Sequence, residues 1–197
     1  MTTRPTCIAL LAALALLGPT LAVARGQQRP PPASDASWYI PNDMAERLLE
    51  LAGVTSSDIV YDLGCGDGRI AIAAAQKHGA RAVGVDSDPD RIALAIVNAE
   101  KAGVSHLVRF VRQDTIDFSE ATVVTLAMPQ SAPWLTNFGL IAETLAKQLR
   151  PGSRVVSTFL PGSLSLWKPT RVDRLADARG EPRAILYLWL YDGAPPR

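Results

Sequence analysis

The residues best suited to chemistry are an acid and a glycine-rich turn at residues 62–68, Asp-Leu-Gly-Cys-Gly-Asp-Gly. Glycine adopts backbone angles that a side chain forbids, and it lets a ligand approach the main chain closely. The spacing G-x-G-x-G differs from the G-x-G-x-x-G of dinucleotide-binding proteins, and the turn lacks the G-K-[ST] of a P-loop. Asp62 and the backbone amides of the turn therefore suit a ligand with an amino-acid end and a nucleoside end, rather than a bare pyrophosphate.

A second acid, Asp86, ends the next apolar segment, 20 residues after Gly66. An acid at this place can accept hydrogen bonds from both ribose hydroxyls of a bound nucleoside. The alternative is a helix cap, but Asp88 followed by Pro89 is already a good helix start. The pattern predicts that Asp86 is left free for a ligand. Asp114, after the third apolar segment, can receive an adenine amino group; the alternative is a polar turn residue.

Other reactive side chains and the overall charge exclude several classes of function. Cys65 stands where the turn needs a small side chain, so we interpret it as steric fit rather than as a nucleophile. His78 and His106 are too few and too far apart in sequence to predict a metal site. Lys+Arg is 20 and Asp+Glu is 19, so the chain has no general attraction to nucleic acid or to anionic membranes.

Alternating strand and helix patterns predict the elements that position these residues. The expected strands lie at about 58–63, 81–86, 108–112, 122–127, 154–160, 170–175 and 184–191. The first expected helix has Asn42 or Asp43 as its cap and ends at Gly53. The others run over about 68–78, 88–102 and 133–149. Strands alternating with helices, followed by a final strand pair, predict an α/β fold. We expect a doubly wound, mostly parallel seven-stranded sheet with one antiparallel strand and helices on both faces.

The N-terminal 37 residues differ in composition from the rest. Residues 1–24 have the pattern of a secretory signal peptide, with Arg4, an apolar run, and the small-x-small cleavage signal Ala-Val-Ala at 22–24. The alternative is an uncleaved membrane anchor, because residues 7–24 are long enough to cross a bilayer. Residues 25–37 predict a Pro-rich linker, and 38–197 one folded domain. The protein would then be exported to the periplasm or secreted, or membrane-anchored and cytosol-facing if the segment is not cleaved.

Five segments together carry a resemblance to a known family; they lie at residues 38–42, 61–69, 84–89, 118–124 and 149–157. They resemble class I S-adenosylmethionine-dependent methyltransferases. The likeness is to the membrane-anchored, mitochondrial-type protein lysine N-methyltransferases, which modify a membrane subunit of the ATP synthase and the adenine nucleotide translocase, and to their bacterial relatives. The resemblance implies a Rossmann-like fold, S-adenosyl-L-methionine as cofactor and a protein lysine as methyl acceptor.

The same resemblance implies roles for individual residues. Asp62 and the turn would hold the methionine part of the cofactor, Asp86 the ribose and Asp114 the adenine. A segment ahead of the first helix would close over the cofactor, and further contacts would come from the second strand end and the turn. The full set of implied cofactor-binding residues is Tyr39, Pro41, Asn42, Asp62, Gly64, Cys65, Gly66, Asp86, Ser87, Asp114 and Thr115.

The substrate-facing loop is expected at Met128-Pro129-Gln130, which is nearer the mitochondrial form than the Leu-Leu-Pro type of many bacterial relatives. Methyl transfer from a sulfonium is an in-line displacement on an activated carbon, so alignment and exclusion of water provide most of the rate. The candidate catalytic residues are therefore few: Pro129, and Gln130, which either positions an amine or is a plain loop residue. The segment lacks the motifs of nucleic-acid methyltransferases.

Three rival functions remain open from the sequence. One is a non-catalytic nucleoside-binding or interaction module on the same fold, because S-adenosylmethionine is made in the cytosol and an exported enzyme would lack it. Another is a small-molecule methyltransferase. An NAD-dependent oxidoreductase shares the argument for Asp86 but fails on the glycine spacing.

Overall fold

The computed structural model describes residues 40–112, 117–127, 138–160 and 167–193, with the side chains of the fourth helix described from residue 141 onward. The helices are α1 (Asn42–Leu51), α2 (Arg69–His78), α3 (Pro89–Lys101) and α4 (Phe138–Gln148). The strands are β1 (Ile59–Leu63), β2 (Arg81–Asp86), β3 (Val108–Arg112), β4 (Val123–Leu126), β5 (Arg154–Ser157), β6 (Arg171–Ala176) and β7 (Pro182–Leu190).

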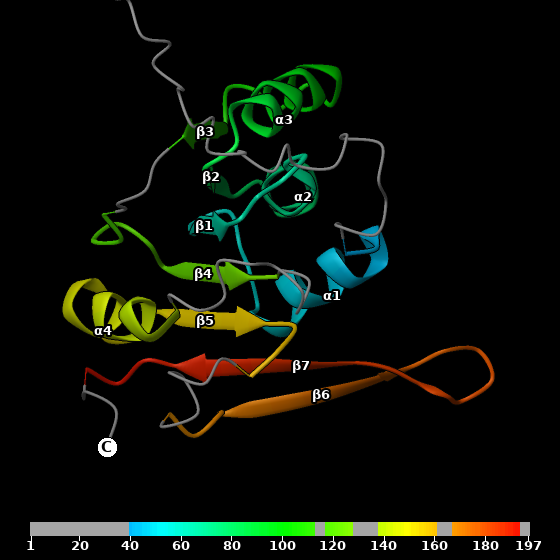
Figure 1. The fold of residues 1–197 in the computed structure, drawn as a ribbon, viewed down its shortest axis with the longest axis vertical. Helices are drawn as coiled ribbons and strands as arrows, with labels where there is room; N and C mark the ends of the chain where they lie inside the picture. The colour runs from blue at the N-terminus through cyan, green and yellow to red at the C-terminus, as the bar shows by residue number, and fades with distance from the viewer. Residues whose placement is uncertain (1–39, 113–116, 128–137, 161–166, 194–197) are drawn as a thin grey trace, which may run out of the picture.

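All seven strands form one sheet in the order β3-β2-β1-β4-β5-β7-β6, which runs from top to bottom in Figure 1. The pairs from β3 through β5 are parallel. Strand β7 is antiparallel to both of its neighbours, β5 and β6. The predicted mostly parallel seven-stranded sheet with one antiparallel strand is confirmed.

Two apolar layers form because successive residues of a strand point to opposite faces of the sheet. One layer contains Tyr61, Val83 and Val155 together with residues of α4. The other contains Val60, Ala82 and residues of α1 and α2, and a smaller cluster joins α2 to α3. Helices α1, α2 and α3 therefore cover one face and α4 the other, as a doubly wound sheet requires.

The corner between β1 and α2 is built from glycines in the left-handed region. Gly64, Gly66 and Gly68 have φ of 71°, 56° and 83°, which side chains rarely tolerate. Gly68 also makes room for the ring of Phe110, since a Cβ built there would lie 2.7 Å from that ring. The same ring would lie 2.5 Å from a Cβ at Gly84 on β2. The bare backbone thus lets β2, β3 and α2 pack closely.

Helix starts show where the local sequence rules succeed and where they fail. Asp88 caps α3 as predicted, because its Oδ1 accepts from the backbone N–H of Asp90 at 2.9 Å. The prediction that Asn42 or Asp43 caps α1 is wrong. Pro41 is the N-cap and no side chain caps this helix, because the Asp43 carboxylate is engaged by Arg183 on β7 instead. Tertiary pairing outweighs the local cap here.

None of the helices in the described part of the chain is long and apolar enough to span a membrane. The apolar segment 7–24 lies outside that part.

Candidate cofactor site

The site lies at the carboxyl ends of β1 and β2, beside the point where the strand order reverses between β1 and β4. Ligands of open α/β sheets bind at such a switch point, outside the carboxyl ends of the strands. Asp62 is the fourth residue of β1 and Asp86 is the last residue of β2. The structure therefore brings the two acids and the glycine turn together, as the sequence predicted.

Asp62 is buried, with 1% of its surface exposed. Its Oδ1 accepts from the Thr125 hydroxyl on β4 at 2.6 Å, while its Oδ2 has no hydrogen-bond partner among the described residues. Burial raises the pKa of Asp62 to about 7, against the lowering effect of the Thr125 hydrogen bond, and the nearby Asp86 and Asp67 add to the rise. A buried acceptor without a donor is costly, so this oxygen is suited to a positively charged group.

The expectation that Asp86 is free of the backbone is wrong. Its Oδ2 accepts from the N–H of Gly66 and its Oδ1 from the N–H of Asp88, both at 3.0 Å. The reason is that the turn folds back over the end of β2, where the N–H groups of Gly64 and Cys65 also donate to the carbonyl oxygen of Val85. A carboxylate offers about four acceptor positions, so ribose binding by Asp86 stays a prediction.

Arg69, at the first position of α2, is a site residue that the sequence did not single out. Its Nε and Nη2 donate to the two oxygens of Asp67 in the turn at 2.9 and 2.6 Å. Its Nη1 donates to the carbonyl oxygen of Ile40 at 2.6 Å. Asn98 of α3 donates to the backbone carbonyl of Asp67 from the other side at 2.9 Å. The turn is thereby fixed to α3 and to the segment ahead of α1.

The remaining predicted contacts divide into those described and those outside the described residues. Cys65 is buried, and burial, together with the surrounding carboxylates, raises the pKa of its thiol, which agrees with a space-filling role. Pro41, Asn42 and Ser87 are exposed, and the carbonyl oxygen of Ser87 accepts from the Arg112 Nε at 3.1 Å. The predicted residues outside the described part are Tyr39, Asp114, Thr115, Pro129 and Gln130.

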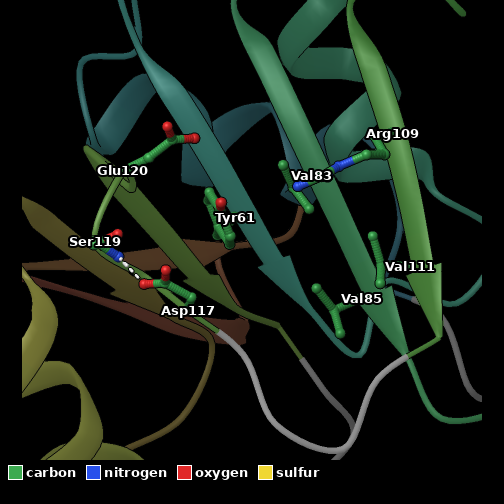
Figure 2. A pocket seen from close by; sticks show the side chains of 8 residues that line it. All are labelled: Tyr61, Val83, Val85, Arg109, Val111, Asp117, Ser119 and Glu120. Carbon is green, nitrogen blue, oxygen red and sulfur yellow. Dashed lines mark hydrogen bonds between the residues drawn. The ribbon is translucent and has the colours of Figure 1, made fainter.

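A separate hollow of about 230 Å³ lies on the sheet face that α4 also covers, and Figure 2 shows its lining. Tyr61, Val83 and Val85 form its floor, with Arg109 and Glu120 among its other lining residues. These floor positions alternate along β1 and β2 with Asp62, Gly84 and Asp86, whose side-chain positions are therefore on the other face of the sheet. The hollow is therefore separate from the side chains of the two acids.

The donor set fits an amino-acid-bearing nucleoside. The Asp62 oxygen that has no partner in the described part of the chain suits the positive charge of its methionine end. The left-handed glycines leave the backbone of the turn open to close approach. Together with the sheet order, this defines the class: an S-adenosylmethionine-dependent methyltransferase with a Rossmann-like sheet.

Known structures and sequences place the chain more narrowly. It is similar to a solved RNA methyltransferase from Salinibacter ruber in complex with S-adenosyl-L-homocysteine, with 42% identity, a TM-score of 0.68, and coverage of 81% of this chain and 97% of that one. It is 40% identical over 152 residues to a protein-lysine N-methyltransferase of Saccharolobus islandicus, which is 75% of this chain and 89% of that protein. It is 35% identical over 117 residues to an ATP synthase lysine N-methyltransferase of Xenopus laevis, 58% of this chain and 48% of that protein.

The family described as "ANTKMT methyltransferase domain" matches residues 62–171. The chain belongs to this family. It is an S-adenosylmethionine-dependent methyltransferase, and the predicted enzyme class and cofactor are both confirmed.

Proposed function

We propose that this enzyme transfers a methyl group from S-adenosylmethionine to the side-chain amine of a lysine in a protein substrate. The observation that carries the proposal is the 40% identity to the archaeal protein-lysine N-methyltransferase, which extends over 89% of that protein. The similar protein from Salinibacter ruber is named an RNA methyltransferase instead, so the acceptor has to be argued from this chain as well.

Charge at the site favours a cationic acceptor over a polyanion. Four acids, Asp62, Asp67, Asp86 and Asp88, lie at or next to the carboxyl ends of β1 and β2. Two arginines at the site are already paired with these acids: Arg69 with Asp67, and Arg91 with Asp88 at 3.5 Å and Asp86 at 4.0 Å. A third, Arg112, donates to the carbonyl oxygen of Ser87. Binding to RNA depends on lysines and arginines that neutralise phosphates, and the chain as a whole has a net charge of only +1.

Methyl transfer depends on alignment of the reactants and exclusion of water more than on acid–base groups. The bound cofactor supplies a methyl group on a sulfonium, which is already activated for displacement. Asp62 holds the methionine end of the cofactor and Asp86 its ribose, and the segment of Pro41 and Asn42 excludes water above it. The acceptor lysine has to lose its proton first, which burial away from water favours. In this proposal Gln130 positions the amine, and Pro129 is the second candidate catalytic residue.

The acceptor is tested by transfer of labelled methyl groups to a lysate from cells that lack this protein. We expect label in material that protease removes and ribonuclease does not, recovered as methyllysine after acid hydrolysis. Label that ribonuclease removes would identify RNA as the acceptor and overturn the proposal. Cofactor binding without transfer to proteins, nucleic acids or small amines would favour the non-catalytic module.

We also propose that residues 7–24 stay uncleaved and hold the enzyme at a membrane with the domain facing the cytosol. The support is the cofactor: S-adenosylmethionine is made in the cytosol, and an exported domain would have none. N-terminal sequencing of the protein from cell fractions tests this proposal. An intact Met1 in the membrane fraction is the expected result, and a mature N-terminus at Arg25 in the exported fraction would contradict it.

A further inference from the structure

The central strand of the sheet, β4, carries one hydroxyl, that of Thr125, among otherwise apolar side chains. Strand β4 reads Val-Val-Thr-Leu, and all four residues are 0% exposed. A buried hydroxyl is costly unless it makes a hydrogen bond. Thr125 lies directly opposite Asp62 in the parallel register of β1 and β4, and its hydroxyl is 2.6 Å from Asp62 Oδ1. The buried Thr125 hydroxyl is therefore satisfied by its hydrogen bond to Asp62.

This hydrogen bond determines which oxygen of the Asp62 carboxylate remains for a ligand. With Oδ1 held by Thr125, the carboxylate cannot rotate freely, and Oδ2 keeps no partner among the described residues. Because this oxygen is sealed from water, a positive charge brought near it acts in a medium of low dielectric constant, where attraction is strong.

We propose that Thr125 is a positioning residue of the cofactor site: its hydroxyl orients Asp62 so that Oδ2 receives the positively charged methionine end of S-adenosylmethionine. The inference rests on the role of Asp62 in cofactor binding. It does not depend on whether the acceptor is lysine.

Other groups around Asp62 have to be counted before its protonation is used as a readout. Asp86 of β2 and Asp67 of the turn raise the pKa of Asp62. Burial and the same three carboxylates raise the pKa of the Cys65 thiol in the turn. From α2, Arg69 is paired with Asp67, and from α3, Arg91 is near Asp86. Among the described residues that act on Asp62, only the Thr125 hydroxyl lowers its pKa.

The test compares two ligands that differ at the end that Asp62 is proposed to face. S-adenosylmethionine carries an ammonium and a sulfonium, whereas 5′-methylthioadenosine keeps the nucleoside and has neither charge. Calorimetry on the full chain gives both affinities for wild type, Thr125→Val, Thr125→Ser and Asp62→Asn. The matched control is Thr122→Val, because Thr122 makes the same kind of hydrogen bond to Asp58, at 2.7 Å, at the opposite end of β1.

In Thr125→Val we expect S-adenosylmethionine to bind about tenfold to a hundredfold more weakly, as for a lost hydrogen bond to a charged group. Binding of methylthioadenosine should stay within about twofold, and Thr125→Ser should restore most of the loss. Thr122→Val should lower stability without changing the ratio of the two affinities. Wild-type affinity for S-adenosylmethionine should rise from about pH 5.5 to about pH 7.5 as Asp62 ionises, and this rise should move to higher pH in Thr125→Val.

An equal loss for both ligands in Thr125→Val, or no recovery in Thr125→Ser, would show a purely structural role and overturn the proposal. If Asp62→Asn changes the ratio while Thr125→Val does not, the cofactor role of Asp62 survives and that of Thr125 is lost. If neither variant changes the ratio, both are lost. The lysine proposal is tested separately by the labelled product.

Discussion

Asp62 is deeply buried, and among the described residues one of its oxygens accepts a hydrogen bond while the other has no partner. This combination ties the stability of the fold to pH. In the unfolded chain its carboxyl ionises near the ordinary value of 3.8, whereas in the fold its pKa is raised to about 7, chiefly by burial. The folded state therefore holds the proton longer. The stabilisation that protonated Asp62 provides is present at low pH and is lost as pH rises toward about 7.

Asp62→Asn should remove this pH dependence. Without added cofactor, the free energy of unfolding of the variant minus that of wild type should grow as pH rises through this range, by on the order of a few kcal/mol. Urea unfolding at about pH 5 and about pH 8 measures the difference. The exposed Glu143→Gln is the control for loss of one carboxylate. A difference for Asp62→Asn that does not change with pH would contradict the assignment.

Gly84 is a second residue whose type is determined by the packing around it. Its backbone is not in the left-handed region, so a side chain there meets only a steric limit, 2.5 Å to the Phe110 ring and 3.0 Å to the Cys65 Cβ. Gly84→Ala should lower the free energy of unfolding by about 1–3 kcal/mol, as overpacking does. Combining it with Phe110→Leu should cost less than the sum of the single changes, which a double-mutant cycle measures. Additive costs would contradict the proposed clash.

At the scale of elements, α2 begins with the residue that connects the glycine turn to the chain ahead of α1. Arg69 holds both oxygens of Asp67 and the carbonyl oxygen of Ile40. Charge-assisted bonds of this bidentate kind add geometric specificity as well as energy. The first turn of α2 therefore sets where the segment before α1 lies relative to the cofactor site.

Arg69→Ala should weaken binding of S-adenosylmethionine by about tenfold, because the turn and the segment before α1 lose their common anchor. Arg69→Lys should recover only part of the loss, since an ammonium cannot form the planar fork. Calorimetry measures the affinity, and Lys147→Ala on the exposed surface of α4 is the control. Affinity equal to wild type in Arg69→Ala would show that this anchor has no part in cofactor binding.

Local signals predicted elements and failed where distant segments meet. The bounds of β2 and β3 and the cap at Asp88 follow from apolar runs and from the Asp-Pro start, which are properties of neighbouring residues. The contact of Asp62 with Thr125 joins positions 63 apart, and that of Arg69 with Ile40 joins positions 29 apart. Such contacts depend on strand order, which spacing alone does not give.

Asp86 illustrates the same limit within the site. Its place at the end of the second strand was predictable, and so was its nearness to the turn. Its hydrogen bond to the Gly66 amide was not, because it depends on how far the turn folds back over β2. The glycines indicated that the turn is bent, but not in which direction its amides point.

Over the whole molecule, the carboxyl ends of the parallel strands form the candidate cofactor site, whereas their amino ends carry contacts that stabilise the fold. At the carboxyl end, acids and left-handed glycines form the candidate cofactor site. At the amino end, Asp58 accepts from Thr55 and Thr122, and Arg154 of β5 pairs with it. Arg154 also donates to the carbonyl oxygen of Ala52 at the end of α1, at 2.9 Å. Burial alone would raise the pKa of Asp58, but these bonds outweigh it and lower the pKa.

Arg154→Leu should therefore separate stability from cofactor binding. Without the Arg154 guanidinium, the nearly buried Asp58 carboxylate loses its cation and the carbonyl oxygen of Ala52 loses a donor. The free energy of unfolding should therefore fall by about 1–3 kcal/mol. The affinity for S-adenosylmethionine should stay within about twofold of wild type, because additivity holds for distant sites. Urea unfolding and calorimetry on the same preparation measure the two quantities. If binding weakened in proportion to stability, the two ends of the sheet would be energetically coupled, and the amino end would belong to the functional site after all.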